Sequence, residues 1–128
     1  MQRKILSIIN TAYRATLEEQ DDAALWFNHA CVLAGADIDI LLTGNAVNYA
    51  IKTDDISPLT IGKREVSHPS HFGKGLTEFQ SCDQKVFYLE EDLLQRGISL
   101  NQLVKPFYGV KKKDLSNLVD SYDMVWRW

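Results

Sequence analysis

The stretch Lys85 to Ile98, KVFYLEEDLLQRGI, most constrains how this chain can fold. A short apolar run, Val86 to Leu89, is followed at once by acidic residues and then by a segment with helical character that stops at Gly97. This pattern predicts a buried strand that leads straight into a helix. Ligands of an open parallel sheet gather beyond the carboxyl ends of its strands, so we expect the functional site between Tyr88 and Asp92.

Strand-like apolar runs alternate with helical patterns along the rest of the chain, which predicts an α/β fold with a parallel sheet. Pro106 removes a ladder donor, so the fourth strand should lie near an edge or begin late. Thr16 and Glu19 form a capping-box pattern at the start of the first helix, and Gly35 should end that helix. The expected strands are Lys4–Asn10, Asp37–Thr43, Val86–Leu89, Val104–Val110 and Met124–Trp128. The expected helices include Thr16–Ala34, Ala46–Lys52, Gly75–Cys82, Ser99–Leu103 and Lys113–Tyr122.

Length and composition limit the class of protein. The 128 residues, 45% of them hydrophobic and 24% charged, fit one globular domain over residues 1–128. A net charge of −3 argues against nucleic-acid binding. No apolar run approaches the roughly 20 residues that span a membrane, and MQRKILSIIN has too short an apolar core for a signal peptide. We therefore expect a cytoplasmic protein whose two cysteines are free thiols.

The irregular segment Thr53–Lys74 is expected to be a long loop, either functional or mobile. It contains His68 and His71, which have the spacing of two metal ligands. A zinc site needs three or four ligands, so we expect no metal here.

The candidate nucleophile is Cys82, because sulfur chemistry needs an accessible thiolate. Seven residues of extended chain place it about 20 Å from Leu89, at the opposite end of the sheet. Cys31 lies in the apolar middle of the first helix, where a cysteine usually acts as a small hydrophobe. Glu90 is the candidate acid, although Glu90, Glu91 and Asp92 could instead complement the helix dipole, worth about 0.3–1 kcal/mol each.

Polar residues that follow the first two strands should meet Glu90 at one edge of the sheet. They suit an anion or a small polar ligand, or alternatively the asparagines only cap turns and helices. The candidate ligand-binding residues are Asn10, Thr11, Tyr13, Arg14, Gly44, Asn45, Asn48 and Glu90.

Large aromatic residues suggest an interface between subunits. Trp126 and Trp128 are seldom left uncovered in water, so we expect a subunit contact over at least one of them. Trp26 could join that contact or the core, and His29 is expected to be an interior or interface histidine.

Three segments carry a family resemblance: LLTGNAVNYA at 41–50, VFYLEEDLLQRGI at 86–98 and LVDSYDMVWRW at 118–128. Together with the plan of five strands, they resemble the DsrE/DsrF/DsrH-like family, which includes the TusB, TusC and TusD sulfur-relay subunits. The resemblance spans nearly the whole chain except Thr53–Lys74. It implies a three-layer α/β/α sandwich around a five-stranded parallel sheet, assembled as a homo-oligomeric trimer or hexamer.

Active members of that family carry persulfide sulfur on a cysteine that corresponds to Tyr88, Leu89 or Glu90, and this chain has no cysteine there. The match is closest to the DsrH/TusB type, whose members also lack it. The resemblance thus implies a non-persulfide-forming structural or binding subunit, with sulfur-relay partner proteins and no cofactor. The alternatives are a small-molecule- or anion-binding protein or an uncharacterised enzyme that uses the pocket at the carboxyl edge, or a purely structural oligomer.

Overall fold

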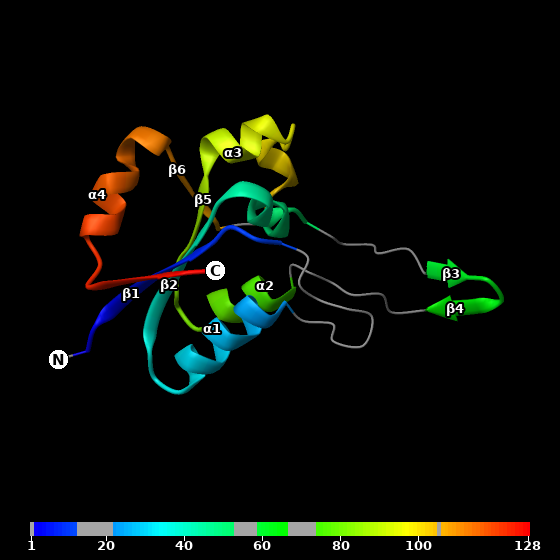
Figure 1. Ribbon diagram of the computed structural model, residues 1–128, viewed down its shortest axis with the longest axis horizontal. Helices are drawn as coiled ribbons and strands as arrows, with labels where there is room; N and C mark the ends of the chain where they lie inside the picture. Colours follow the sequence, from blue (N-terminus) through cyan, green and yellow to red (C-terminus); the bar gives the residue numbers. More distant parts are fainter. Residues whose placement is uncertain (1, 13–21, 53–58, 67–73, 105) are drawn as a thin grey trace.

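A computed structural model describes residues 2–12, 22–52, 59–66, 74–104 and 106–128 (Figure 1). Five strands form one parallel sheet in the order β6-β5-β2-β1-β7, which confirms the predicted α/β class. The strands are β1 (Lys4–Ile9), β2 (Asp37–Leu42), β5 (Val86–Leu89), β6 (Tyr108–Val110) and β7 (Met124–Arg127).

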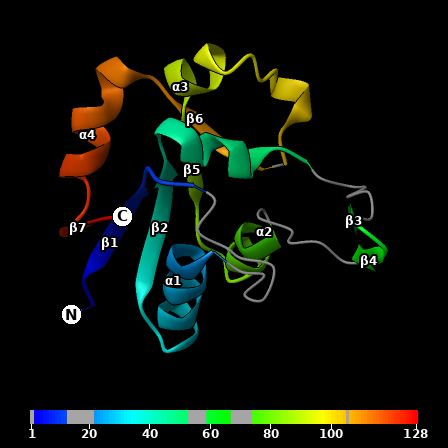
Figure 2. The same cartoon turned by 45° about the vertical axis from the view of Figure 1, so that its right-hand side comes forward.

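Helices surround this sheet (Figures 1 and 2). The α-helices are α1 (Ala23–Leu33), α2 (Lys74–Gln80), α3 (Glu90–Gln95) and α4 (Leu115–Asp120). The 3-10 helices in the described ranges are η1 (Gly44–Ala50), η2 (Leu100–Gln102) and η3 (Lys112–Asp114). None of the helices that the structure describes has the length and apolar character to cross a membrane.

The two faces of β2 contact different helices. Ile38 and Ile40 belong to the core cluster that also contains Leu25 of α1 and Phe79 of α2. Because successive side chains of a strand point to opposite faces, Asp39 faces the other way. Its carboxylate accepts a hydrogen bond from Tyr122, just after α4. Helices therefore lie on both sides of the sheet, as the layered arrangement requires.

The central strands are the most deeply buried. Leu6 and Ile9 of β1 and Leu41 and Leu42 of β2 are fully buried, as expected of parallel strands covered on both faces. Strand β6 is at one edge of the sheet of described strands, next to β5, and it begins at Tyr108, after Pro106. The prediction that proline would move this strand to an edge and delay its start is confirmed.

The predicted start of the first helix is wrong. Helix α1 begins at Ala23, because Asp22 adopts an extended conformation and its carboxylate accepts the backbone N–H groups of Ala24 and Leu25 at 2.8 and 3.3 Å. The predicted cap residues Thr16 and Glu19 lie outside the described residues. The predicted end is confirmed, since Gly35 has φ +102° and its N–H donates to the carbonyl of Val32.

The outer side of α1 stays open to solvent in the single chain. Trp26, which we expected in a subunit contact or in the core, is 60% exposed, and Leu33 is 69% exposed. Phe27 packs on Trp126 and Trp128, with ring centroids 6.1 and 5.5 Å apart, so the two tryptophans at the end of the chain are half-buried within it.

Part of the expected long loop is a hairpin. Strands β3 (Leu59–Ile61) and β4 (Arg64–Val66) pair antiparallel, so a wholly irregular Thr53–Lys74 is wrong. The turn uses Gly62 at φ +62°, a conformation that glycine adopts without a steric penalty. Residues 53–58 and 67–73, which include His68 and His71, lie outside the described residues.

Candidate functional site

The carboxyl ends of β1 and β2 bring two of the predicted polar segments together. Asn10 follows β1, and its Oδ1 accepts a 3.0 Å hydrogen bond from the hydroxyl of Thr43, which follows β2. Gly44 comes next at φ +53°, and a Cβ there would overlap Oδ1 of Asn10. The backbone N–H of Gly44 donates to Oδ2 of Asp92 at 2.7 Å. Asn10 and Gly44 thus lie side by side and are joined to α3.

The next amide is also used within the protein. Oδ1 of Asn45 accepts hydrogen bonds from the guanidinium of Arg96 at 2.9 and 3.3 Å. The same guanidinium donates to the backbone carbonyl of Asp92 at 3.0 Å. These bonds fasten the end of α3 to the start of η1, which favours the alternative in which the asparagines fix turns.

The remaining members of the predicted set are less closely placed. Thr11 is exposed and Asn48 is half-buried within η1. Tyr13 and Arg14 lie outside the described residues. The structure therefore groups Asn10, Gly44 and Asn45 around α3, and it gives no position for the predicted arginine.

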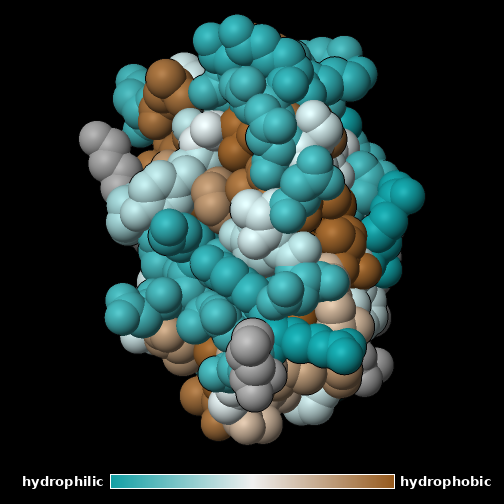
Figure 3. Space-filling view, turned by 90° about the vertical axis from the view of Figure 1, so that its left-hand side faces the viewer, coloured by the Kyte–Doolittle hydropathy of each residue, from teal (hydrophilic) through white to brown (hydrophobic). Residues whose placement is uncertain are grey.

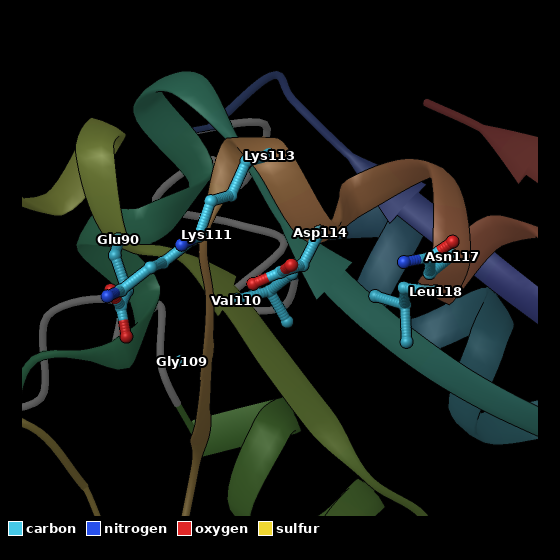
Figure 4. A pocket seen from close by; sticks show the side chains of 8 residues that line it. All are labelled: Glu90, Gly109, Val110, Lys111, Lys113, Asp114, Asn117 and Leu118. Atoms are coloured by element: carbon cyan, nitrogen blue, oxygen red, sulfur yellow. The ribbon is translucent and has the colours of Figure 1, made fainter.

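Glu90 lines a separate pocket of about 520 Å³ beside this group (Figure 4). The pocket lies where β6 ends and the segment leading into α4 begins, and it is rimmed by charged side chains of both signs. Its lining comprises Glu90, Gly109, Val110, Lys111, Lys113, Asp114, Asn117 and Leu118. None of the predicted asparagines lines it.

Gly109 allows the Glu90 carboxylate to lie against the backbone of β6. A Cβ at position 109 would come within 2.6 Å of Oε1 of Glu90 and 3.1 Å of the hydroxyl of Tyr88. Burial, and secondarily the negative charge of Glu90, raise the pKa of Tyr88 above its ordinary value. Tyr88 therefore keeps its proton at neutral pH and is a hydrogen-bond donor close to the floor of the pocket.

The three acidic residues at the start of α3 have different partners. Glu91 accepts the backbone N–H of Lys112 through both carboxylate oxygens, at 2.9 and 3.1 Å. Asp92 accepts the N–H of Gly44, as described above. Both carboxylates thus hold α3 to neighbouring elements, while Glu90 alone of the three lines the pocket.

The two cysteines lie away from this edge. Cys82 is half-buried between α2 and the start of β5, at the amino end of the sheet, and Cys31 is half-buried on α1. Sγ of Cys82 lies 3.8 Å from Nε2 of His29. Across the described ranges, no three His, Cys, Asp or Glu side chains are grouped so as to hold a metal ion.

Sequence reasoning missed the pocket residues that follow β6, opposite Glu90. Lys111 and Lys113 belong to a short basic run, a pattern that is usually only a solvated helix start, and both are exposed. What places them beside Glu90 is the parallel pairing of β5 with β6, in which Leu89 faces Val110. That pairing joins segments far apart in the sequence, so no local sequence pattern predicts it.

Comparisons with known proteins identify the fold. No family model matches the chain, and no curated protein matches it. Among solved structures, the crystal structure of the YchN protein from E. coli matches with a TM-score of 0.71. The match covers 100% of both chains at 19% sequence identity. At this identity the likeness shows the fold alone, an α/β fold with helices around a five-stranded parallel sheet, as the sequence resemblance implied.

Proposed function

We propose that this protein acts as a structural or binding subunit of the sulfur-relay type, without forming a persulfide itself. The observation that carries the proposal is the identity of the residues at the end of β5. Tyr88 and Leu89 are buried there, and Glu90 opens α3. A sulfur carrier needs a thiolate at its transfer point, and this edge presents a carboxylate instead.

The positions of the cysteines support a non-carrier role. A persulfide bound to a donor protein has to meet an accessible thiol. Cys31 and Cys82 are both half-buried, and Cys82 lies at the end of the sheet opposite Glu90. A donor docked at the carboxyl edge would therefore face no acceptor.

The test is incubation with an equimolar donor protein that carries a cysteine persulfide, followed by intact-mass measurement. The expected mass is unchanged. A stable gain of about 32 Da, the mass of one sulfur, on Cys82 would overturn the non-carrier role. The matched control is Glu90→Cys, which places a thiol at the end of β5 and is expected to gain that sulfur in the same assay.

A second candidate function is binding of a small polar anion in the pocket of Glu90. Lys111, Lys113 and Asn117 offer donors to a carboxylate or phosphate group, and the volume of about 520 Å³ is within the usual range for ligand sites. Thermal-shift measurements with phosphate and small carboxylates test this. The melting temperature should rise, and Lys111→Gln with Lys113→Gln should remove the rise. Lys112→Gln is the control, because Lys112 does not line the pocket. A melting temperature unmoved by every anion would reject the candidate.

We also propose a homo-oligomer, a trimer or hexamer, in the cytoplasm. The outer side of α1 supports this, because Trp26 and Leu33 are mostly exposed and Phe27 is 41% exposed. The side of the molecule that carries α4 is different: it is largely hydrophilic, with apolar side chains in separate patches (Figure 3). Helix α1 is therefore the better candidate for a subunit contact.

A further inference from the structure

Three reactive side chains from separate segments meet at the amino end of the sheet. His29 lies on α1, Glu78 on α2, and Cys82 in the turn that leads from α2 to β5. Nε2 of His29 is 3.8 Å from Sγ of Cys82, and Nδ1 of His29 is 3.9 Å from Oε2 of Glu78. The two helices lie side by side in both views (Figures 1 and 2), so the imidazole is placed between a thiol and a carboxylate.

The backbone around Cys82 is firmly held. The N–H of Cys82 donates to the carbonyl of Phe79, and the N–H of Asp83 donates to that of Gln80, both at 3.1 Å. Asp83 has φ +69°, a left-handed conformation that turns the chain from α2 into β5. The position of the thiol next to the imidazole is therefore set by the fold and not by a free loop end.

The two contacts of His29 suit one of its two neutral tautomers. If Nδ1 carries the hydrogen, it points toward the Glu78 carboxylate and leaves the lone pair of Nε2 facing the thiol. This is the order of groups in nucleophilic sites that pair a thiol with a base and orient the base with an acid. The distances are longer than ideal hydrogen bonds, as is common in such sites before a substrate is bound.

We propose that Cys82 is a thiol–disulfide exchange site for small disulfides, with His29 as its base and Glu78 as the residue that positions His29. Nε2 of His29 takes the proton of the thiol, and the thiolate attacks one sulfur of the disulfide. A new S–S bond forms to Cys82 while the original S–S bond breaks. The released thiolate takes the proton back from the imidazolium. The small disulfide is the oxidant, so Cys82 is oxidised and the departing thiol is the reduced product.

Access favours a small reactant over a protein. Cys82 is half-buried, and the side chain of His29 is 21% exposed. A small disulfide can approach such a sulfur, whereas a persulfide on the surface of a folded donor has to be presented at close range. The exchange site goes beyond the proposed function and does not depend on it.

A structural role for the thiol makes a different prediction. Sγ of Cys82 also lies 3.7 Å from the backbone carbonyl of Glu78, which can accept the thiol hydrogen as a local hydrogen bond. In that case His29 would be a neighbour without effect on reactivity. Cys31 provides an internal reference, since it is a second half-buried cysteine of the same chain.

The experiment follows the reaction of the full chain with glutathione disulfide at neutral pH, with peptide mapping to separate the two cysteines. Cys82 should form the mixed disulfide at least about tenfold faster than Cys31, because a positioned base typically contributes a hundredfold or more. His29→Ala should remove this advantage, and added imidazole should restore it by entering the vacated space. His29→Gln, which keeps more of the side-chain volume, should be slow and should not respond to imidazole.

The role of Glu78 in positioning His29 is tested by screening or removing the negative charge of Glu78. Its side chain is 51% exposed, so added salt should slow exchange in the native protein by screening the Glu78–His29 attraction. Glu78→Gln should be slow at low salt and insensitive to further salt. Among the described residues, the titratable groups in contact with the thiol or next to it in the chain are His29, Glu78 and Asp83, and Asp83→Asn controls for a general charge effect.

Two results would overturn the proposal. One is an equal rate at Cys82 and Cys31; the other is a His29→Ala variant that is folded by circular dichroism and reacts at the native rate. Transfer from the protein persulfide donor is a separate outcome: it would remove the non-carrier function while leaving the exchange site intact. Exchange with glutathione disulfide, without sulfur transfer from the donor protein, would support both the exchange site and the non-carrier function.

Discussion

The hydroxyl of Tyr122 donates a 2.6 Å hydrogen bond to Oδ2 of Asp39, a carboxylate buried in the second strand of the sheet. Oδ1 of Asp39 accepts the backbone N–H of Lys85 at 2.8 Å, and the ammonium of Lys4 lies 3.7 Å from Oδ2. One buried charge therefore connects β1, β2, the start of β5 and the end of α4. A buried charge is tolerated only when its oxygens are satisfied in this way.

Tyr122→Phe should lower the free energy of unfolding by about 1.5–3 kcal/mol, the usual worth of a hydrogen bond to a charged group. Urea denaturation measures the loss. Tyr108→Phe is the matched control, because Tyr108 is 46% exposed and its ring contact with Phe87 is kept in the variant. Equal effects of the two substitutions would show that the Asp39 contact contributes nothing.

The same hydrogen bond predicts a loss of stability in alkali. Burial first, then the hydrogen bond to Asp39 and the charges of Asp39 and Asp37, raise the pKa of Tyr122 well above its ordinary value near 10. Above pH 10 the unfolded chain loses this proton while the folded chain keeps it, so stability falls as pH rises. Urea denaturation between pH 9 and 11 should show a steeper fall for the native protein than for Tyr122→Phe. Parallel curves would contradict this.

Asp22→Ala should destabilise α1 strongly. Asp22 is 1% exposed, caps two backbone N–H groups and accepts a hydrogen bond from the hydroxyl of Tyr49. Loss of a cap costs about 0.5–2 kcal/mol, and the buried hydroxyl left without this partner adds to the loss. Asp114→Ala is the control, since Asp114 precedes α4 without a side-chain cap bond. Thermal unfolding should show a large drop for the first variant only.

Gly44→Ala should destabilise the carboxyl edge more than Gly62→Ala destabilises the hairpin. Both glycines have positive φ, +53° and +62°, so both variants carry the backbone strain of about 1 kcal/mol. A Cβ at position 62 meets no atom within 4 Å, whereas one at position 44 overlaps Asn10. Urea denaturation measures the loss of unfolding free energy in each variant. The difference between the two losses gives the cost of disturbing the Asn10–Thr43 hydrogen bond. If Asn10 swings aside freely, the losses will be equal.

Trp26→Glu should shift the protein toward the monomer if the outer side of α1 is the subunit contact, because a buried unpaired charge is unfavourable. Light scattering after size-exclusion chromatography measures the mass. Leu94→Glu is the control on α3, where Leu94 is 74% exposed. A mass that changes only for Leu94→Glu would assign the contact to the other side of the molecule.

The strands were predictable because their signals are local. β-branched and aromatic runs such as Lys4–Ile9 and Val86–Leu89 bury side chains on both faces, and no helical period competes with them. Pro106 fixed the late start of β6 through its missing donor. The start of α1 was misjudged because Thr16 and Glu19 match a capping box, whereas Asp22 has Leu25 and not Glu or Gln three residues on. Asp22 has a second, distant partner in Tyr49, which sequence spacing does not show.

The hairpin at 59–66 was missed for a related reason. Its strands have only three residues each, too few for an alternating pattern to stand out. Gly62 was a usable signal, since a glycine in a two-residue loop between strands is typical of tight hairpins.

The sequence by itself determined the chain order of the five sheet strands and of the helices between them, the absence of a thiol at the end of β5, and the presence of polar residues after the strands, because these follow from local periodicity and residue identity. Only the tertiary structure decided which groups meet. The β5–β6 pairing placed Lys111 and Gly109 beside Glu90, and the packing of α1 on α2 brought His29 to Cys82 across 53 residues. Such contacts arise from long-range burial of apolar faces, which aligns side chains that no spacing in the sequence relates.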